Sequence, residues 1–179
     1  MPLNVAWPKS SLLISEQDVV SAISAQAKQI NSDLGDTPVV VLCVLQGGLV
    51  YAGHLLTQLN MPTDLDSLRV TRYRNTTTGG AELQWLISPS VSLKGKTVLL
   101  LDDIFDEGKT LEELVNWADG EGASQVYSAV MLDKKHDRKP ENFRPDSAAL
   151  EVPDAYVFGM GMDYKGAWRS AAGVWALET

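Results

Sequence analysis

The chain has one cysteine and fewer basic than acidic residues, and these two shortages exclude some folds and some binding partners. A single cysteine, Cys43, cannot form an internal disulfide, so the fold must form without cross-links. Lys and Arg number 15 against 23 Asp and Glu, which gives a net charge of −8. Proteins that bind the nucleic-acid backbone normally carry excess basic residues, so we expect no nucleic-acid partner. Anionic small molecules stay possible, because a local site can oppose the global charge.

Long apolar runs are also missing. No stretch reaches the roughly 18 residues that cross a bilayer, so we expect no contact with a membrane. The first eight residues contain neither a basic segment nor a continuous apolar segment, which argues against a signal peptide. These features predict a cytoplasmic protein. With 179 residues, 45% hydrophobic and 21% charged, the chain suits one globular domain.

A strand–turn–helix unit recurs along the chain. Residues 39–45 form an apolar run typical of a strand covered on both faces, and a glycine turn and a helical pattern follow. Residues 97–101 form a second such run before a long turn over 102–109 and another helical pattern. Further apolar runs cover 126–132 and 157–160. This alternation predicts an α/β fold with a mostly parallel central sheet flanked by helices, whose ligands bind beyond the carboxyl ends of the strands.

Two features stand outside these units. Ser15, with Asp18 three residues later, has the pattern of a helix N-terminus. Residues 69–73 and 83–86 flank a polar, glycine-rich linker that has little to pack, which predicts a hairpin arm with a mobile tip. Composition alone equally allows an inert surface loop there.

The most informative stretch runs from Leu101 to Leu111 and reads LDDIFDEGKTL. Three carboxylates, those of Asp102, Asp103 and Asp106, follow a buried strand, and a glycine then opens a helix. The free N–H groups and the positive dipole end of that helix favour a phosphate. Paired carboxylates accept hydrogen bonds from sugar hydroxyls or bind magnesium. Residue chemistry therefore suggests a site for a phosphate and a sugar.

Other interpretations of this stretch stay open at the level of residue chemistry. Its end is similar to a Walker A loop, but that motif requires glycine at the position of Asp103. A phospho-acceptor domain, or a chance acidic turn, would also place carboxylates at the end of a strand.

The stretch resembles the phosphoribosyl pyrophosphate (PRPP) signature of type I phosphoribosyltransferases, in which apolar, acidic and apolar residues precede Asp-Thr/Ser-Gly-x-Thr. Four more segments resemble the hypoxanthine-guanine branch of that family and follow in the same order. They are a pyrophosphate loop at 45–48, a mobile arm at 69–80, a lysine segment at 132–134, and a purine hood at 152–164 with Arg169. The resemblance runs from about residue 10 to the end of the chain.

The resemblance implies a Rossmann-like type I phosphoribosyltransferase fold with a small hood and a mobile hairpin arm. It implies a single domain over 1–179, with the arm at 69–86 and a hood built from 1–14 and 145–179. The implied activity is purine salvage, in which the 5-phosphoribosyl group of PRPP passes to hypoxanthine or guanine, giving IMP or GMP and pyrophosphate. Mg²⁺ is the implied cofactor, PRPP and a 6-oxopurine base are the implied substrates, and a homodimer or homotetramer is the implied assembly.

Roles for individual residues follow from the same resemblance. Asp102 and Asp103 would hold the ribose hydroxyls and the metal, Asp163 would lie near a second magnesium, and Asp106 would be the general acid/base at N7 of the purine. The residues implied around the 5′-phosphate are Asp106, Glu107, Gly108, Lys109, Thr110 and Leu111. Those implied around pyrophosphate are Gln46, Gly47, Gly48, Arg72, Tyr73 and Arg169. Those implied around the purine are Lys134, Tyr156, Val157 and Asp163.

Some of these residues have simpler interpretations. Lys134 lies in the charged run 133–139, and such runs usually face solvent. Tyr156 also suits an ordinary core aromatic. Neither His54 nor His136 has a ligand pattern near it, so we assign neither to catalysis.

Three positions depart from the family pattern. The family usually has lysine at Gln46, so one positive charge beside pyrophosphate is lost, and Arg72, where serine is usual, would partly replace it. The family usually has threonine or serine at the position of Glu107. Because a carboxylate beside a phosphate is unfavourable, the Glu107 side chain is expected to turn away from the phosphate.

Two alternative functions use the same fold: a PRPP-binding regulatory protein and a xanthine-preferring phosphoribosyltransferase. The hood makes a pyrimidine-specific enzyme the weaker reading.

Overall fold

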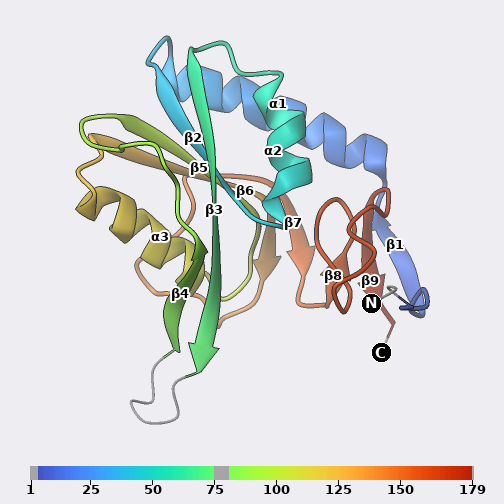
Figure 1. Cartoon of the computed structure of the whole chain (residues 1–179). Coiled ribbons are helices and arrows are strands. Elements are labelled where there is room, and N and C mark those ends of the chain that lie inside the picture. Colours follow the sequence, from blue (N-terminus) through green and yellow to red (C-terminus); the bar gives the residue numbers. More distant parts are fainter. Residues whose placement is uncertain (1–3, 75–80, 179) are drawn as a thin grey trace.

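The computed structural model describes residues 4–74 and 81–178. A six-stranded sheet in the order β4-β3-β2-β5-β6-β7 forms the centre, and a three-stranded sheet in the order β1-β9-β8 lies to one side of it (Figure 1). Neighbouring strands from β3 to β7 are parallel, and only β3 and β4 pair antiparallel in the large sheet. The predicted α/β architecture with a parallel-rich sheet is confirmed.

The elements of the large sheet and its helices follow the expected alternation. The strands are β2 (Val39–Val44), β3 (Thr63–Arg74), β4 (Ala81–Ile87), β5 (Thr97–Phe105), β6 (Gln125–Lys135) and β7 (Ser147–Pro153). The helices are α1 (Glu16–Leu34), α2 (Gly48–Leu56) and α3 (Lys109–Gly120). The small sheet contains β1 (Ser10–Ile14), β8 (Val157–Phe158) and β9 (Val174–Leu177).

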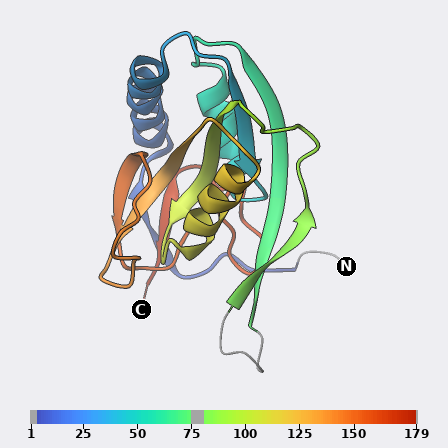
Figure 2. The same ribbon diagram turned by 90° about the vertical axis from the view of Figure 1, so that its left-hand side faces the viewer.

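Alternation along the central strands divides the core into two layers. In β2, Val39, Val41 and Cys43 face a cluster that contains the buried sides of α1 and α2. Val40 and Leu42 face the opposite cluster, which contains the buried side of α3. Helices therefore cover both faces of the sheet (Figure 2), which is why β2 is apolar and buried at every position.

Helix α1 begins where the sequence indicated. The Ser15 hydroxyl oxygen accepts a hydrogen bond from the Asp18 backbone N–H at 3.2 Å. The helix ends at Gly35, whose φ of 58° is strained for a residue with a side chain. The N-cap prediction is thus confirmed by its own geometry.

Three boundaries differ from the sequence-based expectation. Strand β5 continues through Asp102 and Asp103 to Phe105, because its pairing with β6 continues as far as Phe105 and Asp133. Residues 147–153, expected in the hood, form the edge strand β7 of the large sheet, because the long β6 offers its free edge to them. Residues 157–160, expected as another parallel strand, supply the two-residue β8, which pairs antiparallel with β9.

The small sheet joins the two ends of the chain. Strand β1 pairs antiparallel with β9, which lies between β1 and β8. The Trp7 ring packs edge-on against Phe158, Trp168 and Trp175, with ring centroids 4.9–5.2 Å apart. This aromatic cluster holds the N-terminal segment on the sheet that the C-terminal segment builds.

The predicted arm is a hairpin of β3 and β4, paired from Arg69 and Ile87 out to Arg74 and Ala81 (Figure 1). Its expected mobile tip, residues 75–80, lies outside the described residues. No helix in the described part of the chain is long and apolar enough to cross a membrane.

Candidate active site

Two neighbouring cavities open at the carboxyl edge of the large sheet. The larger, of about 460 Å³, is lined by Arg72 of the arm, Asp102, residues 106–110 and Arg138, among others. The smaller, of about 200 Å³, is lined by Asp103, Lys134, Tyr156, Val157 and Asp163, with three further residues. Asp106 lines both cavities. The parallel topology thus brings together most of the residues that the sequence singled out, because the carboxyl ends of these strands share one edge.

The acid pair, Asp102 and Asp103, lies on β5 between the two cavities. Consecutive strand residues point to opposite faces, so one carboxylate lines each cavity. Burial raises the pKa of Asp102, and the negative charge of Asp103 raises it further. Burial also raises the pKa of Asp103, against hydrogen bonds that favour its charged form. Two such carboxylates are suited to hydroxyl donors or to a hard cation.

The pyrophosphate loop, residues 45–48, packs directly against the acid pair. A Cβ atom on Gly47 would lie 1.7 Å from Oδ2 of Asp103. On the other side, a Cβ atom on Gly161 would lie 2.1 Å from the Gly47 carbonyl oxygen, and Gly161 has a φ of 105°. Only residues without side chains fit this contact between loop, strand and hood, which explains both glycines.

The phosphate loop, residues 106–111, turns through Gly108 into α3. Gly108 has a φ of 77°, and a Cβ atom there would lie 2.4 Å from the Phe105 ring. The turn directs the first N–H groups of a twelve-residue helix at the larger cavity, where they favour an anion. The Glu107 carboxylate lies 3.7 Å from the Lys109 ammonium, although Glu107 still lines the cavity. Its turning away from a bound phosphate therefore stays a prediction.

Asp106 has a different partner for each carboxylate oxygen. The Lys134 ammonium forms a hydrogen-bonded ion pair with Oδ2, and Nε2 of His136 lies 2.8 Å from Oδ1. Burial alone would raise the pKa of Asp106, but hydrogen bonds from Lys134 and His136, together with the charge of Lys134, outweigh it and hold the pKa below its usual value. Asp106 is therefore ionised at neutral pH.

His136 is the residue that our sequence analysis missed. We set it aside for lack of a ligand pattern, yet its side chain is only 4% exposed and contacts Asp106. Strand alternation could have identified it. Residues 134 and 136 are two apart at the end of β6, so an extended chain places both side chains on the same face, and His136 should lie near the same site as Lys134.

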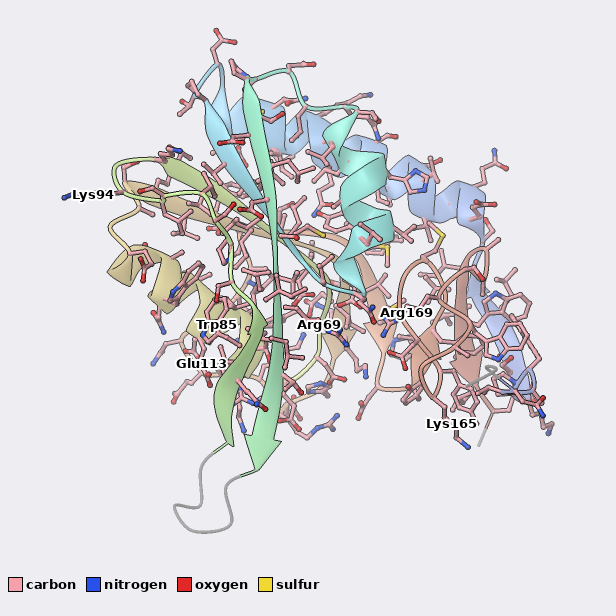
Figure 3. All side chains as sticks on the ribbon, viewed as in Figure 1. Arg69, Trp85, Lys94, Glu113, Lys165 and Arg169 are labelled. Atoms are coloured by element: carbon pink, nitrogen blue, oxygen red, sulfur yellow. The ribbon has the colours of Figure 1, made fainter. Side chains whose placement is uncertain are left out.

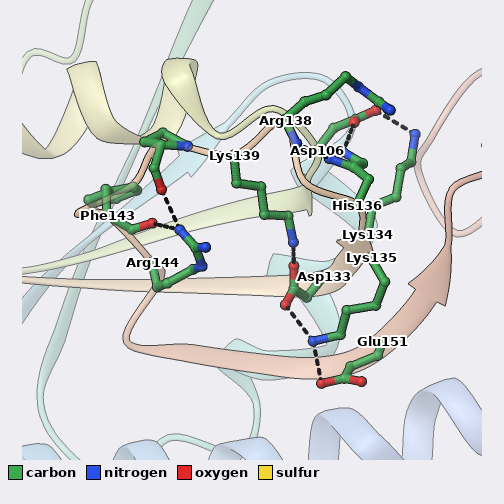
Figure 4. Close-up of polar contacts among 11 residues, drawn as sticks. Asp106, Asp133, Lys134, Lys135, His136, Arg138, Lys139, Phe143, Arg144 and Glu151 are labelled. Atoms are coloured by element: carbon green, nitrogen blue, oxygen red, sulfur yellow. Dashed lines mark hydrogen bonds and ion pairs between the residues drawn. The ribbon is translucent and has the colours of Figure 1, made fainter.

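The charged run 133–139 is only partly a solvated face: Lys135, Asp137 and Arg138 are exposed, but most of its charged side chains form ion pairs (Figure 4). The Lys139 side chain is 5% exposed and pairs with Asp133, and the Arg138 guanidinium donates two hydrogen bonds of 2.8 Å to Asp154. Lys135 lies 2.6 Å from Glu151 of β7. We call residues 133–140 the lysine loop; three of its four Lys and Arg side chains, those of Lys134, Lys135 and Arg138, pair with acids outside the loop.

The hood supplies the far wall of the smaller cavity. Tyr156 is 50% exposed, so it is not a core aromatic, and its hydroxyl donates to the Asp163 carbonyl at 3.0 Å. The Arg169 guanidinium lies 2.8 Å from an Asp163 carboxylate oxygen and donates to the Gly161 carbonyl (Figure 3). Asp163 and Arg169 are thus fixed beside the glycine that touches the pyrophosphate loop.

The arm contacts the phosphate side of the site. The Arg72 guanidinium lies 2.9 Å from the Glu113 carboxylate of α3, and the centroids of the Trp85 and Trp117 rings lie 4.7 Å apart. Figure 3 labels Glu113 and Trp85, which lie next to each other where the arm meets α3. Arg72 lines the larger cavity. Its predicted contact with pyrophosphate is not tested by this arrangement, and the side chain of Tyr73 lies outside the described part of the chain.

Comparison with known proteins agrees with this geometry. Residues 13–166 match the family of the phosphoribosyl transferase domain. Hypoxanthine-guanine phosphoribosyltransferase of Bacillus subtilis is 29% identical over 167 residues, covering 93% of this chain and 92% of that protein. Phosphoribosyltransferase domain-containing protein 1 of Homo sapiens is 31% identical over 168 residues, covering 88% of this chain and 74% of that protein.

Solved structures resemble the chain along almost its whole length. A hypoxanthine phosphoribosyltransferase from Staphylococcus aureus superposes with a TM-score of 0.87 at 23% identity, covering 94% of this chain and 91% of that one, which shows the fold. A hypoxanthine phosphoribosyltransferase mutant from Trypanosoma cruzi, solved as a ternary substrates complex, superposes with a TM-score of 0.86 at 25% identity, covering 96% of both chains.

Proposed function

The chain belongs to the phosphoribosyl transferase domain family, and from this premise we propose that it transfers the 5-phosphoribosyl group of PRPP to hypoxanthine or guanine. The products are IMP or GMP and pyrophosphate. One observation carries the proposal: a helix N-terminus suited to phosphate and a small cavity beside it share the ionised side chain of Asp106. Relatives that are named hypoxanthine-guanine phosphoribosyltransferases and match nearly the whole chain support the same reaction.

On the PRPP side, the phosphate loop binds the 5′-phosphate through backbone N–H groups at the start of α3. The acid pair accepts hydrogen bonds from the ribose hydroxyls. The pyrophosphate loop and Arg169 receive the leaving group, and the absence of a side chain on Gly47 lets the loop lie directly against the Asp103 carboxylate. This arrangement leaves C1 of the ribose between the two cavities, where it meets the base.

On the base side, the purine enters the smaller cavity. Lys134 donates to the 6-oxo group, Tyr156 stacks on the ring, and the backbone of Val157 reads its edge. Asp106 accepts the N7 proton as N9 bonds to C1 of the ribose, which prevents positive charge from remaining on the base. Its low pKa in the free protein keeps the carboxylate deprotonated before the base binds. We expect loss of the Lys134 contact and exclusion of water in the closed complex to bring that pKa closer to neutrality, where the carboxylate is the stronger base.

Magnesium fits the acid pair, because two neighbouring, partly buried carboxylates offer the oxygen ligands that a hard divalent cation prefers. When bound, it would neutralise part of the pyrophosphate charge, and Asp163, in the wall of the smaller cavity, would lie near a second magnesium. We also propose a cytoplasmic homodimer or homotetramer. An apolar groove between α2 and β3, with Leu49 at 60% and Leu65 at 56% exposure, supports self-association.

The test is direct. The protein is incubated with PRPP, magnesium and hypoxanthine, guanine, xanthine or uracil, and the nucleotide is identified by chromatography and mass. We expect IMP and GMP to form fastest. Faster formation of XMP would identify a xanthine-preferring enzyme, and binding of PRPP without any nucleotide product would favour a regulatory protein.

A further inference from the structure

The two oxygens of the Asp106 carboxylate face different surroundings. On the Oδ2 side, Lys134 lines the smaller cavity together with Asp106, so this contact is open to an incoming base. On the Oδ1 side, the His136 ring is only 4% exposed, and Nε2 lies 2.8 Å from the oxygen. Lys134 is therefore in the wall of the cavity, whereas the His136 ring is shielded from solvent.

The tautomer of His136 is determined by its second nitrogen. Nδ1 accepts a hydrogen bond of 3.1 Å from the Arg138 backbone N–H, so Nδ1 carries no proton. The neutral ring must then carry its proton on Nε2, which points at Asp106. The Arg138 side chain holds this stretch of the lysine loop by its paired hydrogen bonds to Asp154. The imidazole is thus a fixed donor to Oδ1.

We propose that His136 is a positioning residue, which holds Oδ1 of Asp106 while Oδ2 exchanges the Lys134 ammonium for the N7–H group of the purine. This inference rests on the proposed function. Lys134 has to leave Asp106 in order to donate to the 6-oxo group. Without His136, the half-exposed Asp106 carboxylate would rotate once Lys134 had left it, because the last torsion of aspartate is broad.

The proton balance assigns the histidine no chemical step. The N7–H bond of the purine breaks, an O–H bond forms at Oδ2 of Asp106, and His136 keeps its own Nε2 proton throughout. Because the Nε2–H group stabilises the charged carboxylate, its removal raises the pKa of Asp106. The acid limb of the pH profile of kcat/KM then moves to higher pH. Charged groups that act on Asp106 and His136 from the surrounding elements are Lys134, Arg138 and Asp154, and Glu107 acts in turn on Arg138.

Two variants separate the donor from the bulk of the ring. His136→Leu keeps apolar volume and removes the hydrogen bond, whereas His136→Gln keeps an N–H donor that reaches as far as Nε2. His54→Leu removes the chain's other histidine, on α2, and is the matched control. The measurements are kcat and KM for hypoxanthine from pH 5 to 9, the Kd of PRPP–magnesium, and the melting temperature.

We expect His136→Leu to lower kcat about tenfold, as loss of a hydrogen bond to a charged group does, with the Kd of PRPP unchanged and the acid limb at higher pH. His136→Gln should recover most of kcat and the wild-type position of the acid limb. His54→Leu should stay within about twofold of wild type, since surface changes seldom reach a distant site.

A leucine variant with the wild-type kcat and acid limb would overturn the proposal. If that variant does not fold, the glutamine variant decides alone: wild-type behaviour supports a donor role, and a tenfold loss without an altered melting temperature contradicts it. A wild-type protein that forms no nucleotide from any base would instead refute the proposed function, and the positioning role would fall with it. Active wild-type enzyme with an unaffected His136→Leu variant refutes the positioning role only.

Discussion

The phosphate loop after β5 and the lysine loop after β6 begin side by side at one edge of the sheet, yet they are built by different means. The phosphate loop is shaped by backbone, through the positive φ of Gly108 and the N–H groups of α3. The lysine loop is shaped by side chains, whose charges meet acids in the phosphate loop, on β7 and directly after β7. The conformation of a backbone-built loop can be predicted from residues that are adjacent in sequence. The conformation of a loop held by side-chain ion pairs can be explained only when its partners, which lie far away in sequence, are known.

Asp106 connects the two loops, and its removal should have the largest effect. Asp106→Asn keeps size and polarity but cannot accept the N7 proton. We expect kcat to fall on the order of 10²–10⁴-fold, with little change in PRPP affinity. Steady-state kinetics together with calorimetric titration of PRPP check both halves. Near wild-type turnover would remove Asp106 from the role of general base.

Lys134 should come next, because the lysine loop then loses its contact with the substrate. Lys134→Met keeps the aliphatic stem, and we expect the KM for hypoxanthine to rise roughly 10–100-fold, as a charged hydrogen bond is lost. PRPP affinity should stay constant. Lys135→Met is the control, since Lys135 is half exposed and pairs with Glu151 away from the cavities. Equal effects of both variants would show that the loop acts through general charge.

Lys139 tests whether the lysine loop is held together by its buried pairs. Lys139→Met leaves the Asp133 carboxylate, 15% exposed, with Lys135 alone, so we expect the free energy of unfolding to fall by about 2 kcal/mol. For a chain of this size, that lowers the melting temperature by about 4–8 °C. Lys9→Met removes an ion pair with Glu178 in which the lysine is 84% exposed. This control should change the melting temperature by no more than about 1 °C. Calorimetry that found equal losses would contradict the distinction.

Glu107 should give the smallest effect, on the phosphate loop. Glu107→Gln removes a half-exposed negative charge beside the predicted phosphate site, so PRPP affinity should rise a few-fold at low salt. The gain should disappear near 1 M salt, where screening shortens the Debye length to about 3 Å. Titrations at two salt concentrations measure it. An affinity unchanged at either concentration would mean that the carboxylate already turns away from the phosphate.

Much of the site was predictable because local pattern and topology agree. The stretch from Leu101 to Leu111 carries its chemistry in adjacent residues, and the apolar runs predict parallel strands whose carboxyl ends meet. The structure accordingly places the acid pair, the phosphate loop and Lys134 around two adjoining cavities. The sequence could not assign residues 147–153 and 157–160 to their sheets, because an apolar run does not specify its pairing partner.

By itself, the sequence determined the fold class, the order of its units and the backbone-built loops, because hydrophobic period and glycine positions act over a few residues. Only the tertiary structure decided that residue 47 must lack a side chain because it packs against Asp103, and that His136 contacts Asp106. It also decided that most charged side chains of residues 133–139 form ion pairs. These contacts join residues far apart in the chain, 30 positions for His136 and Asp106. Such a contact depends on the register between neighbouring strands and on which face each side chain takes, and both are settled only when the sheet packs.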